Sequence, residues 1–396
     1  MLAGYDIVCF SPNPWQALWR NRHQIMSRLA RQNRVLFVEP APYWRPVMAD
    51  LTRQGPSVLA PRPLQEPLPN LWVYRAPGYA AVSGRPPLAG LSFALRRSHL
   101  RQTLRRLGFD RPLLWIFQYN VGEMVGHLHE RLRIYHAVDE YAAYELDVPA
   151  EQEAARREHI RAMEAALIAR MDLVFVASEA LYAGKRSLHP HVVLVPNGAD
   201  VEHFARPGPP PPAMASLPRP RLVFVGAINE KIDLALLAAV AARRPDWQLI
   251  LIGPVNLRRP TQALAHLQSL GNVHFLGTQP PAVLPAFLHA GDLCLMPYVC
   301  NEWTRNISPL KLYEYLATGL PIVSTPIPAV ASFSDLIAVA DGPEAMVAAI
   351  AHMLATDNPE RRQRQQAIAR LHTWEARIER MSAAITERLA ALEARP

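Results

Sequence analysis

The sequence predicts an α/β protein made of two doubly wound domains with parallel sheets. Short β-branched runs alternate with helical stretches along the chain, which is the pattern of parallel strands covered by helices. One Pro-rich segment, residues 204–220, interrupts this alternation, and a second alternation begins after it. A length of 396 residues fits two domains of ordinary size. We therefore expect two strand-helix arrays that face each other across a cleft.

The first array is expected to hold six strands and four helices. Apolar runs indicate strands at 6–10, 35–38, 113–117, 133–136, 173–176 and 192–195. Longer amphipathic stretches indicate helices at 16–31, 92–107, 150–170 and 179–187. The Pro-rich chain between the second and third of these strands is too long for one simple crossover.

The second array is expected to hold five strands and four helices. The strands are predicted at 221–225, 247–252, 273–276, 292–296 and 321–324, and the helices at 234–243, 281–289, 309–318 and 344–356. Residues 204–220 contain seven prolines, which neither a helix nor a central strand tolerates. We therefore predict an N-terminal domain at 1–203, a linker at 204–220 and a C-terminal domain at 221–370. A final helix within 371–396 carries an apolar stripe with which it could cross back to the N-terminal domain.

The composition describes a packed protein with an uneven charge. Half of the residues are hydrophobic and 19% are charged, which excludes bulk disorder. The net charge is +8, and residues 1–110 contain 15 Arg against 5 acidic residues. Such a basic segment suits an anionic partner, or it is a solvated surface in a chain biased towards Arg. Nucleic acid is not expected as a partner, because the basic residues are not interleaved with aromatic ones.

A membrane surface is a further candidate partner. The predicted helix at 92–107 carries five arginines around its leucines, and an apolar Pro-rich stretch at 79–91 precedes it. This pattern fits a helix on an anionic leaflet, or an amphipathic helix packed on the domain. No signal sequence or membrane-spanning run is recognised, and Cys9, Cys294 and Cys300 read as small core residues in a reducing compartment. We expect a cytoplasmic protein, with attachment to the inner face of the cytoplasmic membrane as a further option.

The segment 302–325 carries the clearest chemistry. Asn306, Ser308 and Pro309 resemble a helix start, with Ser308 as the N-cap, and a helix start presents free N–H groups to an anion. Lys311 and Glu314 follow on one face of this helix. A cation near the helix start suits a diphosphate, and a carboxylate one turn later can accept hydrogen bonds from vicinal ribose hydroxyls.

Two places in the N-terminal domain are candidates for binding an acceptor. Asn13 and Trp15 follow the first strand, where doubly wound sheets place ligands, and Arg22 and His23 lie on the next helix. The second place follows the strand at 133–136 and contains three polar side chains, those of His136, Asp139 and Glu140. The alternative for these three is a helix cap or packing at the end of a strand.

The segment 302–325 resembles the nucleotide-binding motif of family 4 retaining glycosyltransferases, which have two Rossmann-like domains in the GT-B arrangement. The likeness is to the branch found in bacterial surface-polysaccharide clusters. That family has two Glu residues seven positions apart, and Glu314 matches the second, which binds the donor ribose. The first falls at Asn306, an amide that can hold the sugar or a phosphate only by hydrogen bonds.

Two further motifs carry the resemblance, which covers about residues 170–335 well and 1–160 in pattern only. The resemblance implies that Gly226 ends the first strand of the C-terminal domain close to the donor, and that Lys231 grips its diphosphate. The Arg that the family has after this Gly is Ala227 here, so Arg305 is the candidate second cation. Gly277 and Thr278 match the turn that reads the nucleobase, or they form an ordinary strand-to-helix turn.

The resemblance implies a hexosyltransferase that moves a sugar from a nucleoside diphosphate, with UDP favoured by family frequency, to a glycan or lipid-linked acceptor. Asp139 or His136 would touch the acceptor or the donor sugar, and Lys231 and Lys311 would stabilise the leaving diphosphate. No cofactor or metal is expected, since no D-x-D pair is present. P-loop, H-E-x-x-H and G-x-S-x-G motifs are also absent. A sugar-nucleotide epimerase of the same fold and a non-catalytic binding scaffold remain alternatives.

Overall fold

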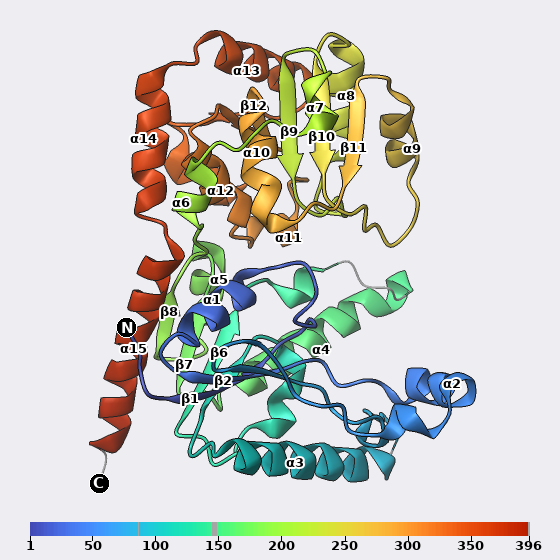
Figure 1. Ribbon diagram of the computed structural model, residues 1–396, viewed down its shortest axis with the longest axis vertical. Coiled ribbons are helices and arrows are strands. Elements are labelled where there is room, and N and C mark those ends of the chain that lie inside the picture. Colours follow the sequence, from blue (N-terminus) through green and yellow to red (C-terminus); the bar gives the residue numbers. More distant parts are fainter. Residues whose placement is uncertain (86, 145–148, 395–396) are drawn as a thin grey trace. The chain divides into compact units, whose positions relative to one another are not determined.

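The computed structural model describes residues 1–85, 87–144 and 149–394, and it divides the chain into two compact units. The first unit contains Met1–Pro196 and Arg377–Pro396, and the second contains Asn197–Ala376. Each unit is an α/β domain around its own, mainly parallel sheet (Figure 1). The predicted fold class of two α/β domains is therefore confirmed.

The first domain has an eight-stranded sheet in the order β3-β4-β2-β1-β5-β6-β7-β8. Its strands are β1 (Asp6–Phe10), β2 (Arg34–Val38), β3 (Gln65–Leu68), β4 (Leu71–Tyr74), β5 (Leu113–Ile116), β6 (Leu132–Ala137), β7 (Leu173–Val176) and β8 (Val192–Leu194). Only β3 runs antiparallel to its neighbour. The order of strands reverses between β1 and β5, and ligands of doubly wound sheets bind at the carboxyl ends beside such a reversal.

The helices of the first domain cover both faces of this sheet. They are α1 (Asn21–Leu29), α2 (Trp44–Gln54), α3 (Leu88–Leu107), α4 (Ala150–Ile168) and α5 (Glu179–Lys185), with short 3-10 turns η1 (Pro56–Leu59), η2 (Gly78–Ala80), η3 (Tyr119–Met124) and η4 (Tyr141–Ala143). All residues of β5 and β7 are buried, which requires cover on both sides. The last helix, α15 (Trp374–Glu393), joins this unit from Arg377 on.

The Pro-rich chain between β2 and β5 is more structured than its composition suggests. It contains α2, the β3–β4 hairpin and the first turns of α3, which begins at Leu88 rather than at residue 92. Pro67 lies in β3, an edge strand. Proline has no backbone N–H to donate, and an edge strand tolerates this because one of its sides has no neighbouring strand. In Figure 1, α2 and α3 lie at the edge of the first domain. Residue 86, in the predicted apolar stretch 79–91, lies outside the described residues.

The second domain has a six-stranded parallel sheet in the order β11-β10-β9-β12-β13-β14. Its strands are β9 (Arg221–Val225), β10 (Gln248–Ile252), β11 (Val273–Gly277), β12 (Leu293–Met296), β13 (Ile322–Ser324) and β14 (Ala338–Val339). Every residue of β9 and β10 is buried. Strands β9, β10 and β11 follow one another towards one edge of the sheet. The next strand in the chain, β12, lies on the other side of β9. The reversal of strand order therefore lies between β9 and β12.

The helices of the second domain form two groups that pack among themselves. They are α6 (Val201–Ala205), α7 (Pro212–Ala215), α8 (Leu234–Arg243), α9 (Gln262–Ser269), α10 (Leu284–His289), α11 (Glu302–Arg305), α12 (Leu310–Thr318), α13 (Pro343–Ala355) and α14 (Pro359–Arg370), with 3-10 turns η5 (Pro281–Val283) and η6 (Pro328–Phe333). One group contains α8, α9 and α13, and the other contains α6, α10, α12 and α14. The Pro-rich segment 204–220, predicted as a linker, lies inside this unit and holds α7, because Pro211 and Pro212 suit the start of a helix.

Candidate active site

The Lys311 ammonium lies at the carboxyl end of β9, beside the reversal of strand order. Its Nζ is 3.0 Å from the hydroxyl of Tyr298 and 4.4 Å from the centre of the Phe224 ring. The Tyr298 ring centre is 5.0 Å away, so the cation lies against two aromatic rings. Lys311 is half-buried. Neither aromatic side chain was singled out from the sequence, although Phe224 lies two residues before the predicted Gly226.

Glycines allow this close approach of backbone and ammonium. Gly226 has φ of +145°, and a Cβ on it would lie 2.9 Å from Lys311 Nζ. Gly253, at the end of β10, has φ of +143°, and a Cβ there would lie 2.1 Å from the Gly226 carbonyl oxygen. An L side chain at either position would therefore both clash and strain the backbone. The two glycines keep open the surface on which Lys311 lies.

Helix α12 is attached to the end of β9 by Tyr315. The backbone N–H of Val225 donates to the Tyr315 hydroxyl over 2.8 Å, and Tyr315 is fully buried. This bond fixes the helix that carries Lys311 and Glu314 next to the strand that ends at Gly226. This buried hydroxyl therefore helps to set the position of the lysine and the carboxylate relative to the sheet.

The start of α12 differs in detail from the prediction. Pro309, with ψ of 122°, is the residue before the helix and not its first helical residue. Ser308 does not cap a helix amide. Its hydroxyl accepts from the Asn197 backbone N–H over 3.2 Å, and its carbonyl accepts from the Asn197 side chain over 2.6 Å. Ser308 thus holds the loop before the helix in place, because an extended Pro309 moves the helix start to Leu310.

Lys231 lies close to Lys311. Its Nζ is 4.8 Å from the centre of the Trp303 ring, and its carbonyl accepts from the Val299 N–H over 2.9 Å. Val299 follows Tyr298, the partner of Lys311, so the two lysines are attached to neighbouring residues of one loop. Their mutual repulsion is one of the causes that lower the pKa of Lys311. The structure thus brings both predicted cations together.

Burial and charge shift the pKa values of both ionisable groups on α12. Burial, and secondly the positive charge of Lys231, lower the pKa of Lys311 to about 7, while Glu314 opposes the shift. Burial raises the pKa of Glu314 to about 7, and the charge of Lys311 opposes this. Within the described residues the Glu314 carboxylate makes no hydrogen bond. A half-buried carboxylate without a hydrogen bond and a half-buried ammonium therefore lie on one helix with shifted pKa values, a combination that marks candidate functional sites.

The other predicted donor residues lie around this centre or at the ends of nearby elements. Arg305 ends α11 and is exposed, and the Asn306 side chain donates to the Glu302 carbonyl over 2.7 Å. Gly277 and Thr278 are exposed at the end of β11. Gly277 has φ of +65°, and its carbonyl accepts from the Gly253 N–H over 2.8 Å.

In the first domain the residues after β1 form a polar and aromatic cluster. The Arg22 guanidinium donates to the Asn13 side chain, and the backbone N–H of Trp15 donates to a Glu39 oxygen over 2.9 Å. The rings of Trp15 and His23 are 5.3 Å apart. Burial, and then the charge of Arg22, lower the pKa of His23 to about 4, so His23 is neutral. The predicted acceptor residues Asn13, Trp15, Arg22 and His23 therefore form one cluster, in which Arg22 and His23 are largely buried.

His136 lies inside the core and not on the surface at the end of its strand. It is 1% exposed, and its ring lies 4.9 Å from that of Phe117 and 5.6 Å from that of Phe175. Burial, and secondly the charge of Arg22, lower its pKa to about 3. The prediction of a ligand contact at His136 is not supported by this placement, because an aromatic cage encloses the ring.

Asp139 and Glu140 have different environments although they are neighbours. Asp139 is half-buried and accepts from the Tyr144 hydroxyl over 2.8 Å, close enough to Arg22 to affect its pKa. Glu140 instead pairs with Lys185 over 3.1 Å. The predicted acceptor role of Glu140 therefore competes with a structural ion pair, whereas Asp139 remains at the end of the sheet with one oxygen bonded.

The sequence analysis missed the buried network around the third lysine of the chain. Lys185 Nζ lies 2.8 Å from a Glu164 oxygen, and the Tyr135 hydroxyl donates to the other Glu164 oxygen over 2.6 Å. Burial alone would lower the pKa of Lys185, but Glu164 and Glu140 more than offset this and raise it. The rarity of Lys could have drawn attention to Lys185, since only three Lys residues occur in this Arg-rich chain.

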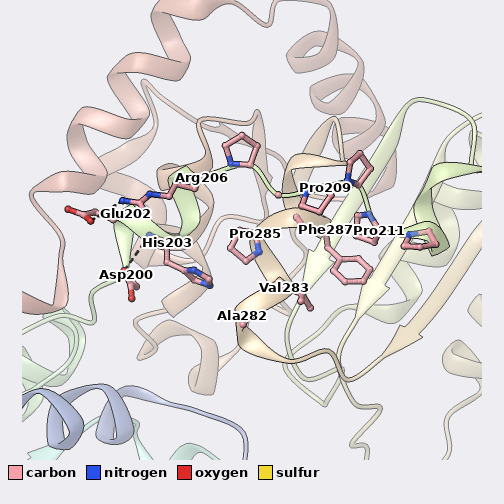
Figure 2. Close-up of a pocket in the computed structure, with 15 residues that line it drawn as sticks. Asp200, Glu202, His203, Arg206, Pro209, Pro211, Ala282, Val283, Pro285 and Phe287 are labelled. Carbon is pink, nitrogen blue, oxygen red and sulfur yellow. Dashed lines mark hydrogen bonds and ion pairs between the residues drawn. The ribbon is translucent and has the colours of Figure 1, made fainter.

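A hollow of about 880 Å³ lies elsewhere in the second domain. Figure 2 shows Pro209, Pro211 and Phe287 on one side of it and the charged residues of α6 on the other. None of the predicted donor residues lines this hollow. Its size alone does not make it the active site, because Lys311 and Glu314, whose pKa values are shifted towards neutrality, lie on α12 beside the end of β9.

Two further findings concern the described residues as a whole. No group of three or more His, Cys, Asp or Glu side chains in them is placed to hold a metal ion. None of the helices in residues 1–85, 87–144 and 149–394 is both long and apolar enough to cross a bilayer.

One comparison with known proteins matches the second domain. Residues 219–356 match the family model described as glycosyl transferases group 1. These residues lie within the second domain. The matched residues contain Gly226, Lys231, Lys311 and Glu314, the groups that meet at the end of β9. A putative teichuronic acid biosynthesis glycosyltransferase of Bacillus subtilis is 27% identical over 234 residues, which span 55% of this chain and 58% of that relative.

Solved structures with the same fold cover nearly the whole chain. Sucrose-phosphate synthase from Thermosynechococcus elongatus has a TM-score of 0.71 and 19% identity, and covers 98% of this chain and 100% of its own. Anabaena HepE, solved in complex with UDP, has a TM-score of 0.61 and 15% identity, and covers 97% of this chain and 100% of its own. These likenesses show a GT-B fold.

Proposed function

We propose that this protein is a retaining, metal-independent glycosyltransferase of family 4 that transfers a hexose from a UDP-sugar. The observation that carries the proposal is the meeting of Lys231, Lys311 and an unbonded Glu314 at the end of β9. Two cations beside a helix start suit a diphosphate, and the carboxylate suits vicinal hydroxyls of a ribose. Structural neighbours solved with UDP or UDP-glucose support this choice of donor.

The proposed role of the lysines is to stabilise the leaving diphosphate. Breaking the bond between the sugar and the diphosphate builds negative charge on the leaving oxygen. Lys311 and Lys231 would compensate this charge in a partly desolvated site, with Arg305 as an exposed third cation. Binding of the diphosphate would also return Lys311 to its charged form, since an anion raises the pKa of a neighbouring ammonium. Asn306, Gly277 and Thr278 would contact the sugar and the base.

The proposed acceptor site is in the first domain, at the carboxyl ends of its strands. Asp139 would orient the acceptor hydroxyl or steady the positive charge that develops on the sugar. The proton of that hydroxyl would pass to the leaving phosphate, so that no strong protein base is required. Asn13, Trp15 and Arg22 form the adjoining surface. The acceptor would be a glycan or a lipid-linked glycan of a surface polysaccharide, in line with the teichuronic acid relative.

The proposal includes peripheral binding to an anionic membrane through α3. Arg105 and Arg106 are exposed in the last turn of this helix, and Arg97 and Arg101 are half-buried. The fifth arginine, Arg96, differs from the prediction, because it is buried and bonded to Ser92 and Glu123. Sedimentation with vesicles tests this part: binding should require anionic lipid and weaken with salt. Equal sedimentation with neutral vesicles would refute an electrostatic membrane contact.

A thermal-shift panel of nucleoside diphosphates tests the donor assignment. A ligand present at 100 times its dissociation constant stabilises the native state by about 2.7 kcal/mol. UDP should raise the melting temperature of the protein, and it should not do so in the Glu314→Ala variant at the same concentration. An equal shift in both proteins would contradict the site, and product analysis with UDP-sugars and a lipid extract would then separate transfer from binding alone.

A further inference from the structure

A small pocket in the first domain is lined by none of the predicted acceptor residues, although Trp15 bonds Glu39 in its wall. It has a volume of about 150 Å³ and opens at the carboxyl ends of β1, β2, β4 and β5, between these strands, α3 and η3. The pocket is at the reversal of strand order between β1 and β5, where doubly wound sheets bind ligands.

The polar lining of this pocket combines fixed charges with unbonded amides. The Glu39 carboxylate is held by Arg75 over 2.7 Å, and Arg96 donates to Ser92 over 2.7 Å. In contrast, the side-chain amides of Gln118 and Asn120 make no hydrogen bond within the described part of the chain. Each amide offers both donors and an acceptor, which is the chemistry that recognises sugar hydroxyls.

Two tyrosines complete a lining typical of sugar recognition. The Tyr74 hydroxyl is fixed 2.9 Å from His99 Nδ1, so that its ring forms a buried wall. Tyr43 also lines the pocket and is 62% exposed, so that its ring stands at the mouth. Aromatic rings present an apolar face to the C–H groups of a sugar, while amides and carboxylates bind its hydroxyls.

The mouth of the pocket continues into an exposed apolar rim, which we define as Tyr43, Trp44, Met48, Tyr79, Leu88 and Leu91. The members other than Tyr43 are between 37% and 59% exposed, which is unusual for so many large apolar side chains in one region. Trp44 and Met48 are one turn apart on α2. The Trp44 N–H donates to the carbonyl of Val82, a residue of the pocket wall, over 3.0 Å.

The second arm of the rim is joined to the pocket through His99. The Tyr79 ring lies 6.3 Å from the His99 ring, and His99 bonds Tyr74 in the pocket wall. Leu88 and Leu91 follow in the first turn of α3, which packs on η2. Residues 41–109 hold ten arginines against Asp50 and Glu66. Two of these arginines, Arg75 and Arg96, are paired with Glu39 and Glu123 of the pocket wall, so eight remain on this side of the balance.

We propose that this pocket binds a single sugar unit of a glycolipid acceptor, with the attached apolar chain lying on the rim. The inference rests on the proposed transferase function and specifies the acceptor as an amphiphile. The amides of Gln118 and Asn120 hold the sugar hydroxyls, and the apolar chain covers Trp44 and Met48. The positive charge around the rim attracts the anionic lipids among which such an acceptor is embedded.

Ligand-observed NMR with paired glycosides tests this proposal on the whole protein. Methyl and n-octyl glycosides of glucose, galactose and N-acetylglucosamine are titrated, the octyl compounds below their micelle concentration. At least one sugar should bind, and its octyl form should bind at least about tenfold more tightly than its methyl form, because the chain buries apolar surface. Gln118→Ala with Asn120→Ala should weaken both forms about tenfold, since two hydrogen bonds are lost.

Rim and control variants separate the two halves of the site. Trp44→Ala with Met48→Ala should remove most of the octyl advantage and leave methyl glycoside binding unchanged. Gln102→Ala and Leu188→Ala, exposed residues outside the pocket and the rim, should change neither form. No binding by any glycoside, or an octyl advantage that survives the rim variant, would overturn the proposal. UDP stabilisation, measured in parallel, reports separately on the donor site, so that the failure of the pocket and of the transferase function are distinguishable.

Discussion

Gly226 leaves the space that the Lys311 ammonium occupies. A side-chain carbon on Gly226 would come within 2.9 Å of Lys311 Nζ and within 3.1 Å of its Cε. The two residues are 85 positions apart in the sequence, and the Tyr315–Val225 hydrogen bond brings their elements together. The glycine at the end of β9 therefore has two roles: it adopts a backbone conformation that other residues avoid, and it leaves room for a cation on α12.

Gly226→Ala should weaken donor binding and also destabilise the fold. The methyl group displaces Lys311, and φ of +145° costs a residue with a side chain about 1–3 kcal/mol. We expect UDP affinity to fall at least about tenfold, because one cation of the pair moves. Calorimetric titration with UDP and chemical unfolding measure the two effects. Gly271→Ala is the matched control, since a side chain there meets nothing within 4 Å. Unchanged affinity in Gly226→Ala would argue against the role of Lys311.

Donor affinity should have a maximum near neutral pH. The pKa of Lys311 is lowered to about 7, so the free protein loses this positive charge as the pH rises above 7, and binding must then take up a proton. The pKa of Glu314 is raised to about 7, so this carboxylate becomes protonated as the pH falls below 7. Donor binding at such a pH must then release a proton. UDP-glucose is a suitable probe, since its diphosphate does not titrate near neutral pH.

Calorimetry in buffers of different ionisation enthalpy measures these protons directly. Proton uptake on the alkaline side should disappear in Lys311→Met, and proton release on the acidic side should disappear in Glu314→Gln. A pH-independent affinity with no proton exchange would show that neither group changes its charge when the donor binds.

Asp139→Asn should separate transfer from donor binding. The amide keeps the size of the side chain and can still bond the Tyr144 hydroxyl, but it removes the negative charge near Arg22. We expect transfer to fall at least about 100-fold, an effect of about 2.7 kcal/mol on the barrier, while UDP affinity stays unchanged. Product formation and UDP titration are the two measurements. A parallel loss of both would mean that Asp139 supports the fold and not the acceptor step.

Lys185→Met should destabilise the first domain strongly. The change leaves the Glu164 carboxylate, which is 3% exposed, without its cation, and breaking a buried ion pair by removing one partner costs about 3–5 kcal/mol. Chemical unfolding measures the loss. Arg161→Met removes one partner of an exposed pair, with Glu158, and should cost less than about 1 kcal/mol. Similar effects of the two variants would contradict the structural role of the Lys185 network.

The strands were predictable because their signal is local. Buried parallel strands appear as short apolar runs, and β1, β7 and β9 have the predicted bounds. The β3–β4 hairpin was missed because prolines hide a short edge strand. Helix starts shifted by a few residues where a proline precedes them, as at Pro87 and Pro309, since such a residue can be helical or extended.

The charged residues of the proposed donor site were singled out from the sequence, whereas their surroundings were not. Lys231, Lys311 and Glu314 stand in motifs with short spacings, and the structure brings them together. The aromatic partners of the two lysines come from separate segments, so no spacing in the sequence relates them. In the same way, the sequence around His136 does not predict the aromatic cage that encloses its ring. Nor does it predict that Glu140 pairs with Lys185.

Turnover of the Lys311→Ala and Glu314→Ala variants at saturating donor is the most direct test of the account. Each change removes one buried contact with the diphosphate or the ribose, worth about 2–4 kcal/mol in the transition state. Both variants should therefore turn over at least about 100-fold more slowly than the unaltered protein, while Arg243→Ala, on the exposed end of α8, should not. Near-normal turnover in both variants would contradict a donor site at the end of β9.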